Sequence, residues 1–123
     1  MKNKIILIAG DPNSINSEII FKSFKKLSKL LKDRIYLIGS YDLIYQQLRK
    51  LNFNLKLQKI DNIKEVHKGN FLKVININLK FMNPFKVHRN EASRYVLKSL
   101  NLAHKIAVED KVAGIINCPI NKN

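Results

Sequence analysis

The sequence predicts an α/β fold, in which helices cover both faces of a mainly parallel sheet, and two observations carry this prediction. First, Ile5 to Ile8 are four apolar residues without polar alternation, which is typical of a strand covered on both faces. Second, the first half of the chain reads as β-α-β-α, whose crossover should be right-handed and whose strands should be parallel. At 123 residues with 46% hydrophobic residues, the chain is long enough for one domain with a core.

The first strand leads into a tight Gly-Asp-Pro turn and then into a helix. Gly10 permits a backbone conformation that other residues resist, and the Asp11 carboxylate can accept hydrogen bonds from amides further along the turn. Asn16 stands at the expected helix N-cap, and Glu18 places an acid in the first turn. Because ligands bind at the carboxyl ends of strands in open α/β sheets, this turn is a candidate binding site.

The remaining elements follow from the period of the apolar residues. Helical spacing predicts helices over Ser17 to Lys32, Tyr41 to Leu51 and Glu91 to Glu109. Continuous apolar runs predict buried strands over Arg34 to Gly39 and Gly114 to Asn117. Alternation predicts two strands with one solvated face, Phe53 to Leu57 and Ile75 to Phe81, near a sheet edge or in an antiparallel excursion.

The formal net charge of +14 is compatible with a nucleic-acid partner, but the makeup of that charge argues against one. Only four of the 23 basic residues are Arg, which supplies the bidentate and stacking contacts of nucleic-acid surfaces. The lysines of the first helix fall opposite its apolar stripe and are expected to be solvated. A small basic α/β module that binds nucleic acid is therefore the second hypothesis, and no nucleic-acid partner is expected under the first.

The expected location is the cytoplasm. Cys118 is the only cysteine, which fits a reducing compartment. The apolar run before Gly10 is too short for a signal peptide, and no stretch approaches membrane-spanning length, so no membrane contact is expected.

Several motifs are absent. Neither a G-x-G-x-x-G fingerprint nor a Walker loop follows the first strand. His67, His88 and His104 lie far apart without a partner at ligand spacing, so solvated or locally bonded histidines are expected. The acidic residues form no recognisable acid/base pair. No catalytic residue and no metal ligand is therefore assigned within this chain.

A second polar loop, Pro119-Ile120-Asn121-Lys122, follows the last predicted strand. The carboxyl ends of parallel strands meet at one rim, so this loop should lie near the Gly-Asp-Pro turn. Lys122 offers a cation to a phosphate or carboxylate, and Asn121 offers a hydrogen bond to such a group.

The two loops together resemble a known family, the 4-hydroxythreonine-4-phosphate dehydrogenases called PdxA. Its motif G-D-P-x-G-I-G-P-E is matched by Gly10, Asp11, Pro12, Ile15 and Glu18, and the P-I-N-K of its motif T-A-P-I-N-K by Pro119 to Lys122. This chain departs from the motifs at Ser14, Asn16, Ser17, Asn117 and Cys118. Losing two glycines of the first motif is expected to change how closely a cofactor can approach.

The resemblance implies a three-layer αβα fold like that of isocitrate and isopropylmalate dehydrogenases, of which residues 1–123 would form the N-terminal part of a mixed, mostly parallel sheet, without a complete second domain. It implies an NAD-dependent homodimeric enzyme with a divalent metal that oxidises and decarboxylates a small phosphorylated amino acid in pyridoxal phosphate synthesis. Gly10, Asp11 and Ile15 would line the cofactor side of the cleft, and Asn121 and Lys122 the substrate side.

By the same resemblance, the metal ligands and catalytic residues would follow Asn123, so the chain is expected to be inactive alone. A partial sheet leaves apolar surface uncovered, and the isolated segment should therefore aggregate or need a partner. A related dehydrogenase of another phosphorylated hydroxy acid is the nearest alternative within the enzyme class.

Overall fold

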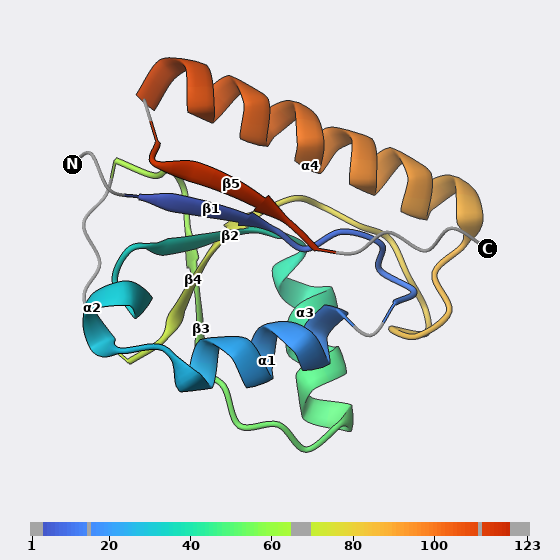
Figure 1. Ribbon diagram of the computed structural model, residues 1–123. Helices are drawn as coiled ribbons and strands as arrows, with labels where there is room; N and C mark the ends of the chain where they lie inside the picture. The colour runs from blue at the N-terminus through green and yellow to red at the C-terminus, as the bar shows by residue number, and fades with distance from the viewer. Residues whose placement is uncertain (1–3, 15, 65–69, 111, 119–123) are drawn as a thin grey trace.

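The computed structural model describes residues 4–14, 16–64, 70–110 and 112–118, which form a sheet between two layers of helix (Figure 1). Its strands are β1 (Ile5–Ile8), β2 (Ile35–Gly39), β3 (Leu57–Ile60), β4 (Leu72–Asn76) and β5 (Gly114–Asn117). Its helices are α1 (Asn16–Lys26), α2 (Lys29–Lys32), α3 (Tyr41–Lys50) and α4 (Arg89–Asp110). The described helices include none that is long and apolar enough to cross a membrane.

The five strands are ordered β3-β4-β2-β1-β5, and each neighbouring pair is parallel. The predicted α/β fold is therefore confirmed. All the described strand pairs are parallel, so the antiparallel excursion considered for the alternating segments is not found among them, whereas β3 lies at the sheet edge, the other place that was predicted. Alternation reports which faces of a strand are solvated, not the direction of its neighbour.

Helices cover both faces of the sheet, which confirms the three-layer arrangement. On one face, α1 and α3 pack on a cluster that includes Ile20, Phe24, Leu37, Leu48 and Val74. On the other face, α4 packs on Ile6, Ile8, Tyr36, Ile38 and Ile75 through Ala103 and Ile106. Figure 1 shows α4 alone on its side of the sheet and α1, α2 and α3 on the opposite side.

Only part of each alternating segment forms the predicted strand. β4 ends at Asn76, so the predicted strand from Ile75 to Phe81 is wrong beyond that residue. Leu79 and Phe81 instead pack against a small cluster of Leu43, Val87 and Ala92 at the carboxyl end of the sheet. β3 begins only at Leu57, while Phe53 stacks on Phe21 of α1 with ring centroids 4.6 Å apart. In both cases the apolar residues outside the strands pack on helices.

The first predicted helix is divided. α1 ends at Lys26, and Ser28 caps a separate short helix α2 by accepting a hydrogen bond from the Leu31 amide at 3.3 Å. A serine inside a helical pattern can end one helix and cap the next, since its hydroxyl satisfies a free amide. Asn16 is the first residue of α1 instead of the residue before it.

The last strand was predicted to be buried, and this is wrong although its bounds are correct. β5 lies at the sheet edge, where Ile115 is 42% and Ile116 is 52% exposed. β1 is likewise covered unevenly: Ile6 and Ile8 are buried on the α4 side, whereas Ile5 and Leu7 on the other side are only half-buried.

Candidate functional site

The segments that lead into the two predicted loops lie side by side at the carboxyl end of the sheet. β1 pairs with β5 so that Ile8 lies opposite Asn117, and the Cys118 amide donates to the Ile8 carbonyl at 3.1 Å. A Cβ atom built on Gly10 would stand 3.2 Å from the Cys118 carbonyl oxygen. Gly10, in the first loop, and Cys118, the last residue before the second, therefore lie close together.

Gly10 is required by the turn itself. Its φ of +80° lies in the left-handed region, which residues with a Cβ rarely adopt. A Cβ there would also stand 2.8 Å from the Asn16 side-chain nitrogen. Because Asn16 and Cys118 fill the space beside Gly10, the packing of the fold alone explains this glycine.

Side chains of the turn hold its own backbone. The Asp11 carboxylate accepts from the Asn13 amide at 2.9 Å, which confirms the predicted role of Asp11 in the turn. The Asn16 side-chain amide donates to the Ala9 carbonyl at 2.8 Å, so it ties α1 to the end of β1. Asn16 replaces a glycine of the resembled motif, and here its side chain braces the turn.

Asn13 fastens the turn to a segment far away in the sequence. Its side chain donates to the Val87 carbonyl at 2.9 Å and accepts from the Val87 amide at 2.7 Å. This two-bond pairing brings the loop before α4 to the same rim as the turn. Sequence reasoning did not assign a role to either residue.

Gln47 of α3 joins three segments and was also missed. Its Nε2 donates to the carbonyls of Pro12 at 2.9 Å and Pro84 at 2.7 Å. Its Oε1 accepts from the Ser17 hydroxyl of α1. A signal existed in the sequence, because Gln47 falls on the predicted apolar stripe of its helix, and a buried glutamine needs partners.

Tyr95 of α4 supports the neighbouring strand end. Its hydroxyl is buried and accepts from the Ser40 amide at 2.7 Å, where α3 begins. Burial raises the pKa of Tyr95 to about 12 and that of the Cys118 thiol to about 11. Both groups are therefore neutral near pH 7, and neither is a ready base or nucleophile.

The structure describes only some of the predicted site residues. Gly10 and Asp11 lie at the rim as expected, whereas Ile15, Asn121 and Lys122 fall outside the described residues, as does His67. His88 and His104 are exposed, and His88 accepts from the Asn90 amide at 3.2 Å, so these two histidines are solvated or locally bonded as predicted. Within the described ranges, His, Cys, Asp and Glu form no group of three that would hold a metal ion.

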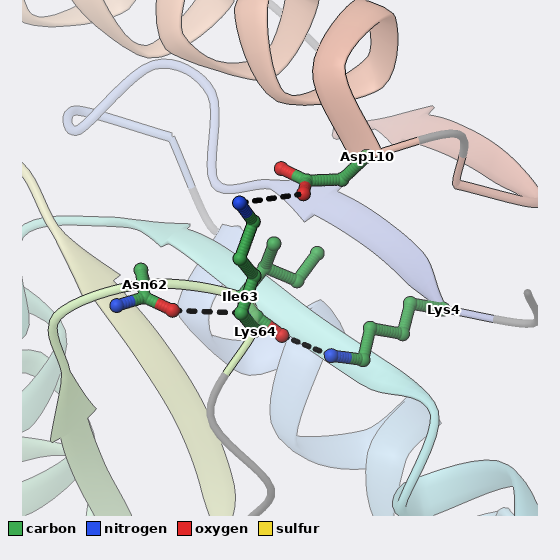
Figure 2. Close-up of polar contacts among 5 residues, drawn as sticks. All are labelled: Lys4, Asn62, Ile63, Lys64 and Asp110. Atoms are coloured by element: carbon green, nitrogen blue, oxygen red, sulfur yellow. Dashed lines mark hydrogen bonds and ion pairs between the residues drawn. The ribbon is translucent and has the colours of Figure 1, made fainter. Parts of the chain in front are cut away.

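Several basic residues make internal contacts near the amino ends of the strands. Figure 2 shows the Lys4 ammonium donating to the Ile63 carbonyl, beside an ion pair between Lys64 and Asp110 at 4.0 Å. Lys73 is buried, donates to the Asp33 carbonyl at 2.6 Å and lies 4.3 Å from the centre of the Tyr36 ring. Burial lowers the pKa of Lys4 and of Lys73.

Comparisons with known proteins identify the family of this chain. A family model described as pyridoxal phosphate biosynthetic protein PdxA matches residues 31–123. The chain is 28% identical over 122 residues to a 4-hydroxythreonine-4-phosphate dehydrogenase of Sulfurihydrogenibium, and 32% identical over 123 residues to one of Helicobacter pylori. It covers 97% and 98% of its own length in these alignments but spans only 36% of either relative.

Solved structures show the same fold. A dehydrogenase of that name from Burkholderia phymatum superposes with a TM-score of 0.85 at 20% identity, over 99% of this chain and 38% of the other. The corresponding enzyme from Klebsiella pneumoniae gives 0.78 at 24% identity, over 98% of this chain and 38% of the other.

Proposed function

The chain belongs to the PdxA family, and on that premise we propose that it forms the N-terminal wall of the cleft of an NAD-dependent 4-hydroxythreonine-4-phosphate dehydrogenase. The observation that supports the proposal is the closeness of Gly10, which opens the first motif, to Cys118, the residue before Pro119 to Lys122, at one rim of a parallel sheet. In open α/β sheets this rim is where ligands bind. The substrate would be a small phosphorylated hydroxy amino acid.

Each predicted site residue has a proposed role. Asp11 lies half-buried at the rim, and its carboxylate is suited to accept hydrogen bonds from cofactor hydroxyls. Gly10 shapes the turn that carries Asp11, and Ile15 is proposed to line the same cofactor wall. Asn121 and Lys122 are proposed to face the substrate, where the Lys122 ammonium would attract its phosphate.

The chemistry needs groups that these residues do not supply. When bound beside Gly10, Asp11 and Ile15, NAD would supply the hydride acceptor for oxidation of the hydroxyl-bearing carbon of the substrate. The residues described by the structure offer no ligand set that fits a divalent metal, so no step is assigned to a metal in this segment. The segment is therefore proposed to bind and orient, while the remainder of a family chain, assembled as a homodimer in the cytoplasm, provides proton transfer and metal ligation.

The test is an activity assay on a protein of family length that carries these 123 residues as its N-terminal part. With NAD, a divalent metal and 4-phosphohydroxythreonine, reduction of NAD is expected, and the 123-residue chain alone is expected to give none. Asp11→Asn should raise the KM for NAD more than it lowers kcat, while Asp42→Asn on the exposed side of α3 should change neither. If this family-length protein left 4-phosphohydroxythreonine unchanged but oxidised another phosphorylated hydroxy acid, the substrate assignment would be wrong.

Nucleic-acid binding is the competing function, and its only support is the charge of +14. Two of the lysines that contribute to this charge, Lys4 and Lys73, make hydrogen bonds within the protein. A titration with DNA and RNA at low salt should show no tight, salt-sensitive binding. Binding that weakens steeply with added salt would favour the basic module over the enzyme.

A further inference from the structure

A basic pocket of about 240 Å³ lies between the end of α1, the end of α2 and the segment that leads into β3. Phe24 and Leu55 give it an apolar side, and Phe24 is buried in the core. The polar part of the lining consists of three lysines and two asparagines, Lys25, Lys32, Lys56, Asn54 and Asn70. Because several of these residues lead into β2, β3 and β4, the pocket lies at the amino end of the strands, opposite the rim that carries Gly10.

Aromatic rings hold two of the lysines beside the pocket. The Lys25 ammonium lies 5.7 Å from the centre of the Phe21 ring, and the Lys32 ammonium lies 5.5 Å from the centre of the Phe24 ring. Both distances are within the reach of about 6 Å that cation–π contacts have. Since the two rings themselves line the pocket, these contacts keep both ammonium groups next to it.

The charged residues that line this pocket are all lysines. Other exposed lysines have a carboxylate partner, as Lys22 has in Glu18 at 3.5 Å. Within the described part of the chain, the three lysines of the pocket form no ion pair. Like charges that share one pocket repel each other, and an anion placed among them replaces this repulsion with attraction. The pocket is therefore suited to an anion.

We propose that the basic pocket binds a small organic phosphate, with its phosphate among the three lysines and its carbon skeleton against Phe24 and Leu55. A phosphate oxygen makes strong charge-assisted hydrogen bonds with ammonium groups, and one phosphate has enough oxygens for several donors. The side-chain amides of Asn54 and Asn70 are further donors at the same pocket. The pocket is smaller than the range of about 300–1,000 Å³ that is usual for drug-sized ligands, which favours a small molecule. This inference does not depend on the proposed dehydrogenase activity.

The test is a titration of the dilute 123-residue chain with phenyl phosphate, followed by the backbone amide signals in two-dimensional NMR spectra. The amides of Leu55, Lys56 and Asn70 should shift, whereas those of Gly10 and Asp11 should not. Phenyl phosphate should bind at least about tenfold more tightly than inorganic phosphate or phenol, because each of these supplies only the charged or only the apolar half of the contact.

Variants of α2 separate the pocket from the overall charge. Lys32→Gln should weaken binding of phenyl phosphate about fivefold, the effect of losing one exposed ammonium beside a phosphate, and Lys32→Arg should bind within about twofold of wild type because it keeps the charge. The matched control is Lys29→Gln, which removes the same charge from the exposed first residue of α2, outside the pocket lining. It should bind phenyl phosphate like the wild type.

Three results would overturn the proposal. Equal weakening by Lys32→Gln and Lys29→Gln would show attraction to the net charge alone. Shifts confined to Gly10 and Asp11 would place the phosphate at the carboxyl rim, and equally tight binding of inorganic phosphate would show that the carbon skeleton makes no contact. Since binding is measured without NAD or turnover, these outcomes are separate from the substrate assay.

Discussion

Replacing Gly10 by alanine tests the interpretation that this glycine serves the fold. A residue with a Cβ at φ +80° costs on the order of 1–3 kcal/mol in backbone strain. The new Cβ would also displace the Asn16 amide, which stands 2.8 Å from its position and bonds the Ala9 carbonyl. Losing that buried hydrogen bond costs about 1 kcal/mol more. We therefore expect Gly10→Ala to lower the free energy of unfolding by about 2–4 kcal/mol.

Gly114→Ala is the matched control, because the chain offers a second strand-associated glycine in open space. A Cβ on Gly114 would meet nothing within 4 Å, and its φ is not positive. The substitution should change stability by less than about 1 kcal/mol, in the stabilising direction, since alanine restricts the unfolded chain.

Urea unfolding of the dilute chains, followed by far-ultraviolet circular dichroism, measures both effects. With a slope of about 2 kcal/mol per molar urea, Gly10→Ala should move the midpoint down by about 1–2 M. Equal midpoints for the two variants would refute the packing argument and leave cofactor contact as the reason for this glycine. The control also shows whether the method detects an ordinary glycine replacement.

Three further predictions concern groups buried at the same rim. Gln47→Leu leaves the Pro12 and Pro84 carbonyls and the Ser17 hydroxyl without their partner, so it should lower the free energy of unfolding in urea by about 2–4 kcal/mol. The control Gln46→Leu, on the exposed side of α3, should lower it by less than about 0.5 kcal/mol. Similar losses in the two variants would contradict the role of Gln47. The folded-state pKa of Tyr95, about 12, exceeds the ordinary value of 10.0, so its contribution to stability is complete below pH 10 and is lost as the pH rises from 10 to 12. Tyr95→Phe should reduce this loss of stability between pH 10 and 12 by up to about 2–3 kcal/mol relative to wild type. Parallel pH profiles of stability in the two proteins would refute the raised pKa of Tyr95. The lowered pKa values of Lys4 and Lys73 change stability in the opposite direction, but they are common to both proteins. Cys118, whose pKa is raised to about 11, should react with iodoacetamide at pH 8 at least about tenfold more slowly when folded than in urea, and equal rates would show that the thiol is not buried.

Local patterns were enough to predict most elements of the fold. Tyr41 to Leu51 and Gly114 to Asn117 agree with α3 and β5 to within a residue, because hydrophobic period and flanking turn residues act over a few positions. The same patterns failed at Ile75 to Phe81, where Leu79 and Phe81 alternate like a strand but pack on a cluster formed by residues 43, 87 and 92. Periodicity shows that a residue is buried, but not which element buries it.

In the candidate site, too, the sequence predicted local features but not long-range contacts. Gly10 and Asp11 were found from sequence because turn chemistry is local, and the Asp11 carboxylate does bond the Asn13 amide. The bonds from Asn13 to Val87 and from Gln47 to Pro84 span 74 and 37 positions, so no local signal names their partners. What the sequence signalled at Gln47 was only a polar side chain on an apolar stripe.

By itself, then, the sequence determined the α/β class, the parallel direction of β1 and β5 and the turn at Gly10. Each of these depends on residues that are neighbours along the chain or on the direction common to parallel strands. Tertiary structure alone decided that β5 is an exposed edge and that Gln47 and Asn13 brace the turn. Strand order and long-range hydrogen bonds depend on which distant segments meet, and a run such as Gly-Ile-Ile-Asn is the same whether or not another strand covers it.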